Sequence, residues 1–374
     1  MADSGSQQEP RFFRTLQKDL HVVWEEVGRV GVRQTVRRSF TDLQEFYLTT
    51  QRRDRLAGMG RVKRTLSLAF WLLKALFLKL TPARRLLLLV SFWFMWQGSF
   101  QFTSGNTRIT FDFPFFGIAL LLLILMLELK DKLLARNELE AGRAVQLALM
   151  PDRAPSLPGW DIWLYTRSAN DVGGDLVDYL QIDPQRLAVA LGDVAGKALP
   201  AALLMAKLQA TIRALASQCD TLDDLGRRVN HILNRDGLPN RFATLVYLEL
   251  APGNGHVRLL IAGHMPPLLL RAGTLEELPR GSIALGITPD ADFTEQHVDL
   301  QPGEIMLVYS DGVTEAQNRG GDFFGDDRLR ATLAAAGALT AERAGRSVLA
   351  AVDAFTGDAP VFDDLSLIVL KRLA

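Results

Sequence analysis

The sequence of 374 residues contains a single cysteine, Cys219. One thiol excludes an intrachain disulfide, and it excludes any metal cluster that needs several cysteines. A reducing compartment is therefore the simple expectation. We also expect no cleavable signal, because the apolar run begins late and acidic residues precede it.

Several familiar nucleotide and metal motifs are missing as well. The chain has no GxxxxGK[ST] loop, no GxGxxG after a predicted strand, no HExxH and no paired Cys and His residues. Nothing therefore indicates a P-loop, a dinucleotide-binding fold or a zinc protease.

The formal net charge is zero, but its distribution is uneven. Residues 1–85 contain 17 Lys and Arg against 8 Asp and Glu, whereas residues 150–374 contain 20 against 29. The basic part runs directly into an apolar segment. We therefore expect it to lie near anionic membrane lipid and expect no nucleic-acid partner.

Residues 1–65 are polar and basic, with apolar positions at helical spacing that predict short amphipathic helices. A poorly ordered cytosolic tail is the alternative. Residues 66–80 are apolar but carry Lys74 and Lys79. Because a span needs about 20 apolar residues, this stretch predicts a helix in the membrane interface.

Two charge-free apolar stretches follow, and they predict transmembrane helices at about 86–102 and 113–129. A short polar loop, 103–112, is expected between them. Basic residues flank both outer ends: Arg84, Arg85, Lys130 and Lys132. The positive-inside rule then predicts a hairpin with both outer ends in the cytosol. In a bacterial cell this corresponds to the inner membrane. A buried hairpin of a soluble protein is the alternative.

Residues 130–150 should continue the second span as a helix, until Pro151 stops it. Leu134, Ala141, Val145 and Ala148 lie near heptad positions, although Glu138 occupies one such position. A coiled coil, and with it a homodimer, and a solvated helix both remain open. The predicted domains are thus 1–65 (basic and cytosolic), 66–129 (membrane), 130–150 (helical linker) and 151–374.

From Trp160 onward the pattern changes to short apolar runs separated by turns. The predicted strands are 162–166, 187–191, 243–250, 257–262, 267–271, 305–309 and 366–370, and the predicted helices are 201–217, 222–233, 331–336 and 341–355. Strands and helices fall into separate groups. This predicts an α+β fold of antiparallel sheets with helices packed outside.

Acidic residues stand at strand ends or turns in this last domain, next to glycine or to an apolar strand. They are Asp175, Asp193, Asp311 and the pair Asp363 and Asp364. Each alone is more often a turn former or helix cap. Together they predict a site for hard cations, because several converging carboxylates cannot all ionise without one. Two Mg²⁺ or Mn²⁺ ions could activate water for hydrolysis of a phosphate ester.

The combination and order of these motifs resemble the SpoIIE-like serine phosphatases, the bacterial branch of the metal-dependent PPM protein phosphatases. The matching segments cover residues 144–371, and they are AVQLALMP, SANDVGGDLVDY, LAVALGDVAGKALPAALLMAKLQATIR, NRFATLVYLEL, AGHMPPLLL, LGI, PGEIMLVYSDGVTEAQN, FFGDDRL and DDLSLIVL. The resemblance implies an αββα sandwich and hydrolysis of phosphoserine or phosphothreonine on a protein.

The resemblance also implies the roles of individual residues. Metal ligands would be Asp175, Asp193, Asp311 and Asp363, with Val194 supplying a backbone carbonyl. Asp364 would support them, and Gly174 and Gly312 would permit close backbone approach.

The chain departs from the family pattern at two places. Gly196-Lys197-Ala198 replaces the usual Gly-His-Gly, and the family's YTDG is YSDG here. Lys197 could contact the substrate phosphate or could be a solvated lysine. His264 could be a general acid or a structural histidine in a turn. No arginine can be assigned to phosphate binding from spacing, so the substrate-binding residues stay unknown.

We therefore expect a membrane-anchored, cytosol-facing protein-serine/threonine phosphatase that acts on a small regulatory protein such as an anti-sigma-factor antagonist. Its cofactors would be two Mn²⁺ or Mg²⁺ ions. One alternative is a catalytically silent signalling module on the same fold. A phosphohydrolase for small molecules is another.

Overall fold

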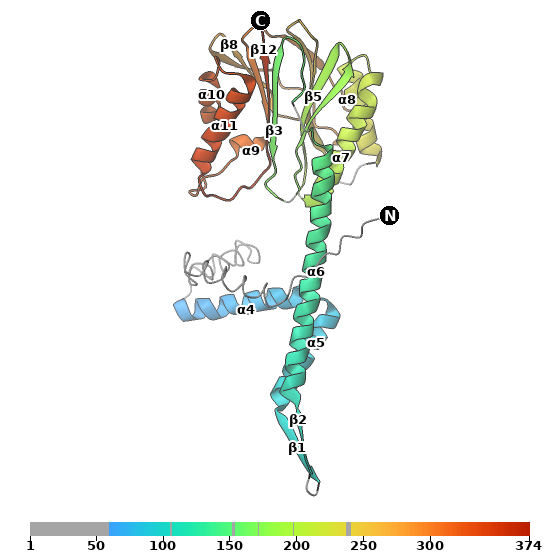
Figure 1. The fold of residues 1–374 in the computed structure, drawn as a ribbon, viewed down its shortest axis with the longest axis vertical. Coiled ribbons are helices and arrows are strands. Elements are labelled where there is room, and N and C mark those ends of the chain that lie inside the picture. Colours follow the sequence, from blue (N-terminus) through green and yellow to red (C-terminus); the bar gives the residue numbers. More distant parts are fainter. Residues whose placement is uncertain (1–59, 105–106, 152–153, 171, 197, 237–240) are drawn as a thin grey trace, which may run out of the picture. The chain divides into compact units, whose positions relative to one another are not determined.

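The computed structural model describes residues 60–104, 107–151, 154–170, 172–196, 198–236 and 241–374 (Figure 1). The chain divides into two compact units, Met1–Asp131 and Lys132–Ala374. The predictions for Lys197 and for residues 1–59 lie outside the described residues.

The described part of the first unit, from residue 60 onward, contains helices and a small hairpin, namely α4 (Arg61–Lys79), α5 (Pro82–Gln97), β1 (Ser99–Ser104), β2 (Thr107–Asp112) and the first part of α6 (Phe113–Leu149). The predicted helix through residue 102 and the predicted loop at 103–112 are wrong. Gly98 ends α5 at a positive φ of 67°. Beyond it, SFQFTS and TRITFD alternate with period two and pair antiparallel.

Helices α5 and α6 pack closely against each other in the first unit. A Cβ on Gly117 would lie 2.7 Å from both Met95 Cγ and Ser91 O, so only glycine fits there. At the other end of the pair, Arg84 bonds the carboxylates of Glu128 at 2.7 Å and Asp131 at 2.6 Å. Close approach at small residues is a common way for helices to associate in lipid.

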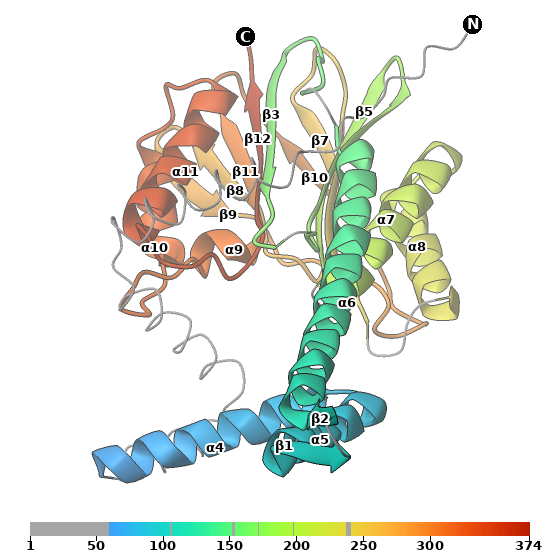
Figure 2. The same ribbon diagram turned by 60° about the horizontal axis from the view of Figure 1, so that its bottom comes forward.

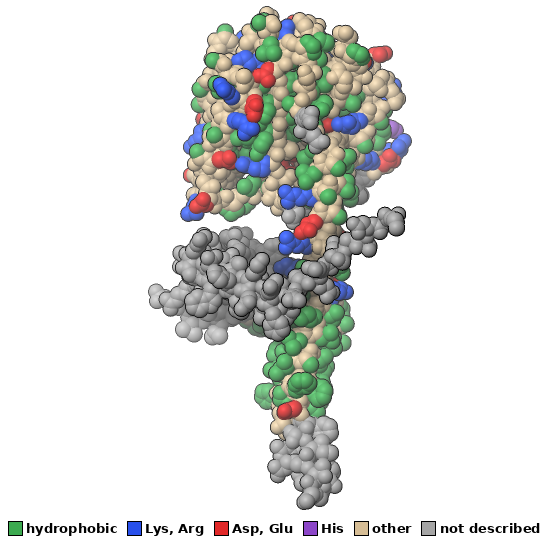
Figure 3. Space-filling model, in the orientation of Figure 1, with side chains coloured by type: hydrophobic (Ala, Val, Ile, Leu, Met, Phe, Trp, Pro, Cys, Tyr) green, Lys and Arg blue, Asp and Glu red, His purple; other side chains and the backbone are tan. Residues whose placement is uncertain are grey.

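Large apolar side chains cover the outer faces of this helix pair (Figure 3). The exposed set on α5 and the first part of α6 includes Leu86, Leu89, Phe92, Trp93, Trp96, Phe115, Ile118, Leu122, Leu125 and Met126. Among the described residues, two helical segments are long and apolar enough to cross a membrane, Phe113–Leu149 and Leu199–Gln218. The second belongs to a helix that packs on a sheet, so only α6 is left as a candidate by this criterion. Helix α5, with 16 residues, is shorter than a usual span.

The second unit contains two five-stranded antiparallel sheets, as the α+β prediction required. The first has the order β10-β7-β6-β5-β4, and the second has the order β3-β12-β11-β8-β9. The strands are β3 (Trp160–Arg167), β4 (Leu176–Asp183), β5 (Arg186–Val194), β6 (Ala243–Leu250), β7 (His256–Ala262), β8 (Leu268–Arg271), β9 (Thr274–Glu277), β10 (Glu295–Asp299), β11 (Ile305–Tyr309) and β12 (Leu365–Arg372).

Helices cover the outer face of each sheet (Figure 2). They are α7 (Ala198–Leu215) and α8 (Leu222–Asp236) on the first sheet, and α9 (Asp311–Thr314), α10 (Gly325–Ala334) and α11 (Ala341–Thr356) on the second. One apolar cluster lies between the sheets, and one lies under each helical layer. The result is a four-layered αββα sandwich.

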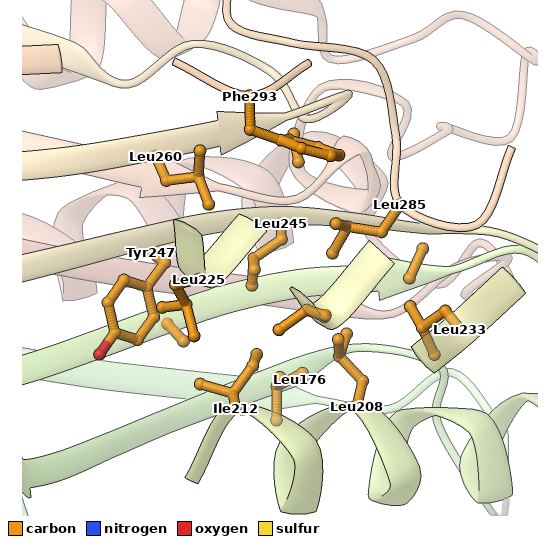
Figure 4. Close-up of a cluster of buried hydrophobic side chains, with 14 of the residues drawn as sticks. Leu176, Leu208, Ile212, Leu225, Leu233, Leu245, Tyr247, Leu260, Leu285 and Phe293 are labelled. Atoms are coloured by element: carbon orange, nitrogen blue, oxygen red, sulfur yellow. The ribbon is translucent and has the colours of Figure 1, made fainter. Parts of the chain in front are cut away.

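The sequence of α8 explains its packing. Leu222, Leu225, Val229 and Leu233 follow helical spacing and are all buried. Together with Leu208 of α7 they meet residues of the underlying sheet (Figure 4). This packing fixes the helical layer against the sheet that contains β5, the strand that ends next to Asp193.

Candidate metal centre

The first half of the acidic site comes from the neighbouring strands β4 and β5. Leu176, the first residue of β4, pairs with Gly192 of β5, so Asp175 stands next to Asp193 across the two strands. Cross-strand neighbours have Cβ atoms about 5 Å apart. A Cβ on Gly174 would lie 3.3 Å from Val194 O and 3.4 Å from Asp193 Oδ1, which shows how closely this loop approaches the end of β5.

The second half comes from β11 and β12 in the other sheet. Asp311 follows β11 as the first residue of α9, and Asp363 lies just before β12. Gly312 permits this approach, because a Cβ there would collide with the Asp364 carbonyl oxygen. The Ser310 hydroxyl also donates to that oxygen at 3.1 Å.

Asp364 ties the two halves together. Its Oδ2 accepts from the backbone N–H of Gly174 at 2.5 Å and of Asp175 at 3.3 Å, and its Oδ1 accepts from Ala169 N–H at 2.7 Å. The carboxylate is buried, and both of its oxygens accept hydrogen bonds from backbone N–H groups. This agrees with a supporting role for Asp364.

The acidic groups repel one another strongly. Burial raises the pKa of Asp193 to about 6, and the charges of Asp311, Asp363 and Asp364 add to the rise. Burial and the charges of Asp193 and Asp364 raise the pKa of Asp175 well above its usual value, and nearby Ser366 and Ser310 offset part of this. The charges of Asp311 and Asp363, at the ends of β11 and β12, raise the pKa of Asp193 in β5. The two halves therefore face a common space.

The charge at this centre has no protein counter-ion in the described part of the chain. None of the five Asp residues forms a salt bridge there with Lys, Arg or His. The Asp175 Oδ2 atom is fully buried and, within the same residues, has no hydrogen-bond partner. A buried, unpartnered carboxylate oxygen among like charges is the environment in which a divalent cation is expected.

The donor set fits hard cations better than zinc. All the candidate ligands are oxygens, and no His or Cys reaches the centre in the described residues. Across those residues, no group of three or more His, Cys, Asp or Glu side chains is gathered tightly enough to hold one ion. Mg²⁺ commonly uses only one or two carboxylates and keeps several waters. The ligand assignment to Asp175, Asp193, Val194, Asp311 and Asp363 thus stays a prediction that the chemistry of the donors supports.

His264 has both ring nitrogens engaged. Its Nδ1 lies 2.8 Å from Thr244 Oγ1, and its Nε2 lies 3.0 Å from the Tyr309 carbonyl oxygen. Burial lowers the pKa of His264 to about 4. Because the Tyr309 carbonyl can only accept a hydrogen bond, Nε2 must carry the proton, and this bond connects the loop after β7 to β11 in the other sheet. The geometry therefore favours a structural histidine over a general acid.

Two polar residues at the site were not identified from the sequence. Gln146, near the end of α6, is buried and makes two hydrogen bonds to the Gly173 backbone: its Nε2 donates to Gly173 O at 2.8 Å, and its Oε1 accepts from Gly173 N–H at 3.0 Å. Arg241 donates from Nη1 to Ala195 O at 2.6 Å, just beyond Val194. The signal for Gln146 was a lone amide in the apolar run AVQLALM.

Comparison with known proteins agrees with this geometry. Residues 183–373, just over half of the chain, match the family described as Stage II sporulation protein E (SpoIIE). The chain belongs to the SpoIIE family.

Two relatives share sequence with this SpoIIE-family chain, and one solved structure shares its fold. Protein IcfG of Synechocystis is 30% identical over 236 residues, which are 56% of this chain and 37% of that protein. Phosphoserine phosphatase RsbU of Bacillus subtilis is 24% identical over 239 residues, or 63% of this chain and 70% of RsbU. The SiaA-PP2C domain of Pseudomonas aeruginosa superposes with a TM-score of 0.57 at 20% identity, covering 65% of this chain and 99% of that domain.

The predicted αββα sandwich and the predicted family are therefore confirmed. The chain spans little more than a third of the length of IcfG.

Proposed function

We propose that this chain is a membrane-anchored, metal-dependent protein phosphatase that hydrolyses phosphoserine or phosphothreonine on a regulatory protein. The single observation that carries the proposal is the buried, unpartnered Asp175 Oδ2 within a group of acidic side chains that lacks a basic partner in the described residues. Membership of the SpoIIE family and the name of RsbU as a phosphoserine phosphatase support the same reaction.

Two Mn²⁺ or Mg²⁺ ions, when bound, would supply an activated water and positive charge for the phosphoryl oxygens. Asp175, Asp193, Asp311 and Asp363 would hold them, together with the Val194 carbonyl. Asp364 fixes the backbone of Gly174 and Asp175, so the first pair of carboxylates keeps its place relative to the second. No protein nucleophile is required.

The substrate is proposed to be a phosphorylated protein such as an anti-sigma-factor antagonist. The basis is the family resemblance alone.

The membrane anchor is proposed to be the α5–α6 hairpin, with α4 in the interface and both outer ends in the cytosol of a bacterial cell. Support comes from the apolar outer faces of the hairpin and from the Arg84 pairs, which bring its two outer ends together. The same proposal retains the predicted regions 1–65, 66–129, 130–150 and 151–374, with a homodimer through the helical linker.

Phosphate release by the full chain in detergent or nanodiscs tests this function. A phosphoserine protein and Mn²⁺ should give release that stops when Mn²⁺ is chelated and is lost in Asp193→Asn with Asp311→Asn. A folded chain that releases no phosphate from any phosphoprotein and binds no metal would instead indicate a silent signalling module. Faster turnover of small phosphate esters than of phosphoproteins would indicate a small-molecule phosphohydrolase.

A further inference from the structure

A cavity of about 270 Å³ lies next to the acidic centre. Gly312 and Asp363, which belong to the second half of that centre, form part of its wall. The remaining wall comes from the end of β3, residues 315–317 after α9, the end of α11, the 357–362 loop and the first residue of β12. The cavity and the candidate metal centre therefore share a boundary.

About half of the lining is apolar, while charged groups come from Arg167 and from three carboxylates, Glu315, Asp353 and Asp363. Val352 of α11 lies in the floor and is buried, while Val361 and Phe362 are each more than half exposed. Exposed large apolar residues beside a cavity are typical of a binding surface.

The cationic group in the wall is already neutralised. Arg167 Nη2 lies 2.8 Å from Asp353 Oδ1, and both residues line the cavity. This pair fixes the Arg167 head group, so its charge is not available for a free anion. The cavity consequently does not resemble a second phosphate site.

The size of the cavity points to a side chain. Sites for drug-sized molecules have volumes of about 300–1,000 Å³, and this one lies just below that range. An extended peptide advances about 3.3 Å per residue. A residue within about three positions of a phosphoserine held at the acidic centre would therefore reach a cavity that shares a wall with it.

We propose that this cavity is a specificity pocket, which receives an aliphatic or aromatic side chain of the phosphoprotein substrate close to the phosphoserine. The proposal rests on the phosphatase function proposed above. It adds a substrate class to it: phosphoproteins with an apolar residue at one fixed position near the phosphorylated serine.

A set of phosphoserine peptides tests the pocket with the full chain in detergent. Each position from three before to three after the phosphoserine is changed in turn to Leu, Phe, Gly or Asp. The expected result is one position at which Leu or Phe raises kcat/KM at least about 10-fold over Asp, since a buried apolar group is worth about 10–200-fold in discrimination.

The variant Ala359→Trp should fill the cavity, because Ala359 is in its lining. It should abolish the preference for Leu or Phe and leave the hydrolysis of p-nitrophenyl phosphate within about twofold of wild type. Ala354→Trp is the matched control, since Ala354 is exposed on α11, the helix just before the 357–362 loop, and lies outside the cavity lining. If Ala359→Trp does not fold, Val361→Asp at the exposed edge should reduce the same preference.

Two results would overturn the pocket. One is a flat peptide scan for wild type, and the other is a preference that survives both Ala359→Trp and Val361→Asp. A chain that hydrolyses neither peptides nor p-nitrophenyl phosphate contradicts the phosphatase function instead. In that case fluorescence anisotropy with the same peptides decides the pocket, because binding preference does not depend on turnover.

Discussion

Replacing Gln146 by leucine should weaken metal activation far more than it weakens the fold. The Gln146 amide is buried and is the group on α6 that holds Gly173, two residues before Asp175. Leucine has a similar volume but leaves the Gly173 N–H and C=O without this partner. A buried polar group left unpaired costs about 1–3 kcal/mol. If the loop stayed in place, the two unpaired groups would lower the free energy of unfolding by about 2–6 kcal/mol.

The loop can avoid most of that cost by moving toward water, and this movement would displace Asp175. Loss of a group that orients a metal ligand typically weakens metal binding about 10–100-fold. We therefore expect the Mn²⁺ concentration for half-maximal phosphate release to rise by that factor, with a smaller change in the free energy of unfolding measured in urea.

Gln209→Leu is the matched control. Gln209 is equally buried, and its Nε2 donates to Leu149 O at 2.7 Å, but it does not bond the Gly173 loop. It should lower the free energy of unfolding by about 1–3 kcal/mol and leave the Mn²⁺ midpoint unchanged. Equal Mn²⁺ midpoints for Gln146→Leu, Gln209→Leu and wild type would refute the reasoning.

Three further predictions concern charge, the loop clamp and the helix pair. Because the folded-state pKa of Asp193 is raised to about 6, its ionised form lowers stability above that pH, and this cost disappears as pH falls from about 6 to about 4. Asp193→Asn should therefore stabilise the metal-free chain at pH 8, by at most about 3 kcal/mol, and remove the change in its stability between about pH 6 and 4, as measured by urea unfolding. Asp364→Ala removes three backbone hydrogen bonds and should both lower the thermal midpoint and abolish phosphate release, whereas unchanged release would contradict a supporting role. Gly117→Leu should separate α5 from α6, which loss of a disulfide crosslink between cysteines introduced on the two helices would detect; an equal crosslinking yield would contradict the packing at Ser91.

Two of the strands could be predicted closely from the sequence. The predicted bounds 243–250 and 305–309 coincide with β6 and β11, because both are short, mostly apolar runs bounded by turns. Strand β4, which follows Asp175, was missed together with β9 and β10; all three lie at sheet edges and carry several polar side chains. An edge strand needs little apolar pattern, because one side of it faces solvent.

The site could be predicted less completely than the fold. The four ligand candidates stood out because each Asp adjoins glycine or an apolar strand. The contacts of Gln146 could not be predicted, because its partner is 27 residues away in an irregular loop. Arg241 lies opposite Gly196 only once the register of β5 and β6 is known. Strand β1 was missed because its aromatic residues also suit a membrane helix, and β2 was missed because its polar residues also suit a loop.

Counting bound manganese tests the central claim most directly. The claim is that the acidic centre holds two divalent cations, with Asp175 among their ligands. Equilibrium dialysis of the full chain against Mn²⁺, with metal measured by mass spectrometry, should give two ions per wild-type chain and fewer in Asp175→Asn. No bound manganese in the folded wild type, or an equal count in both proteins, would contradict the account.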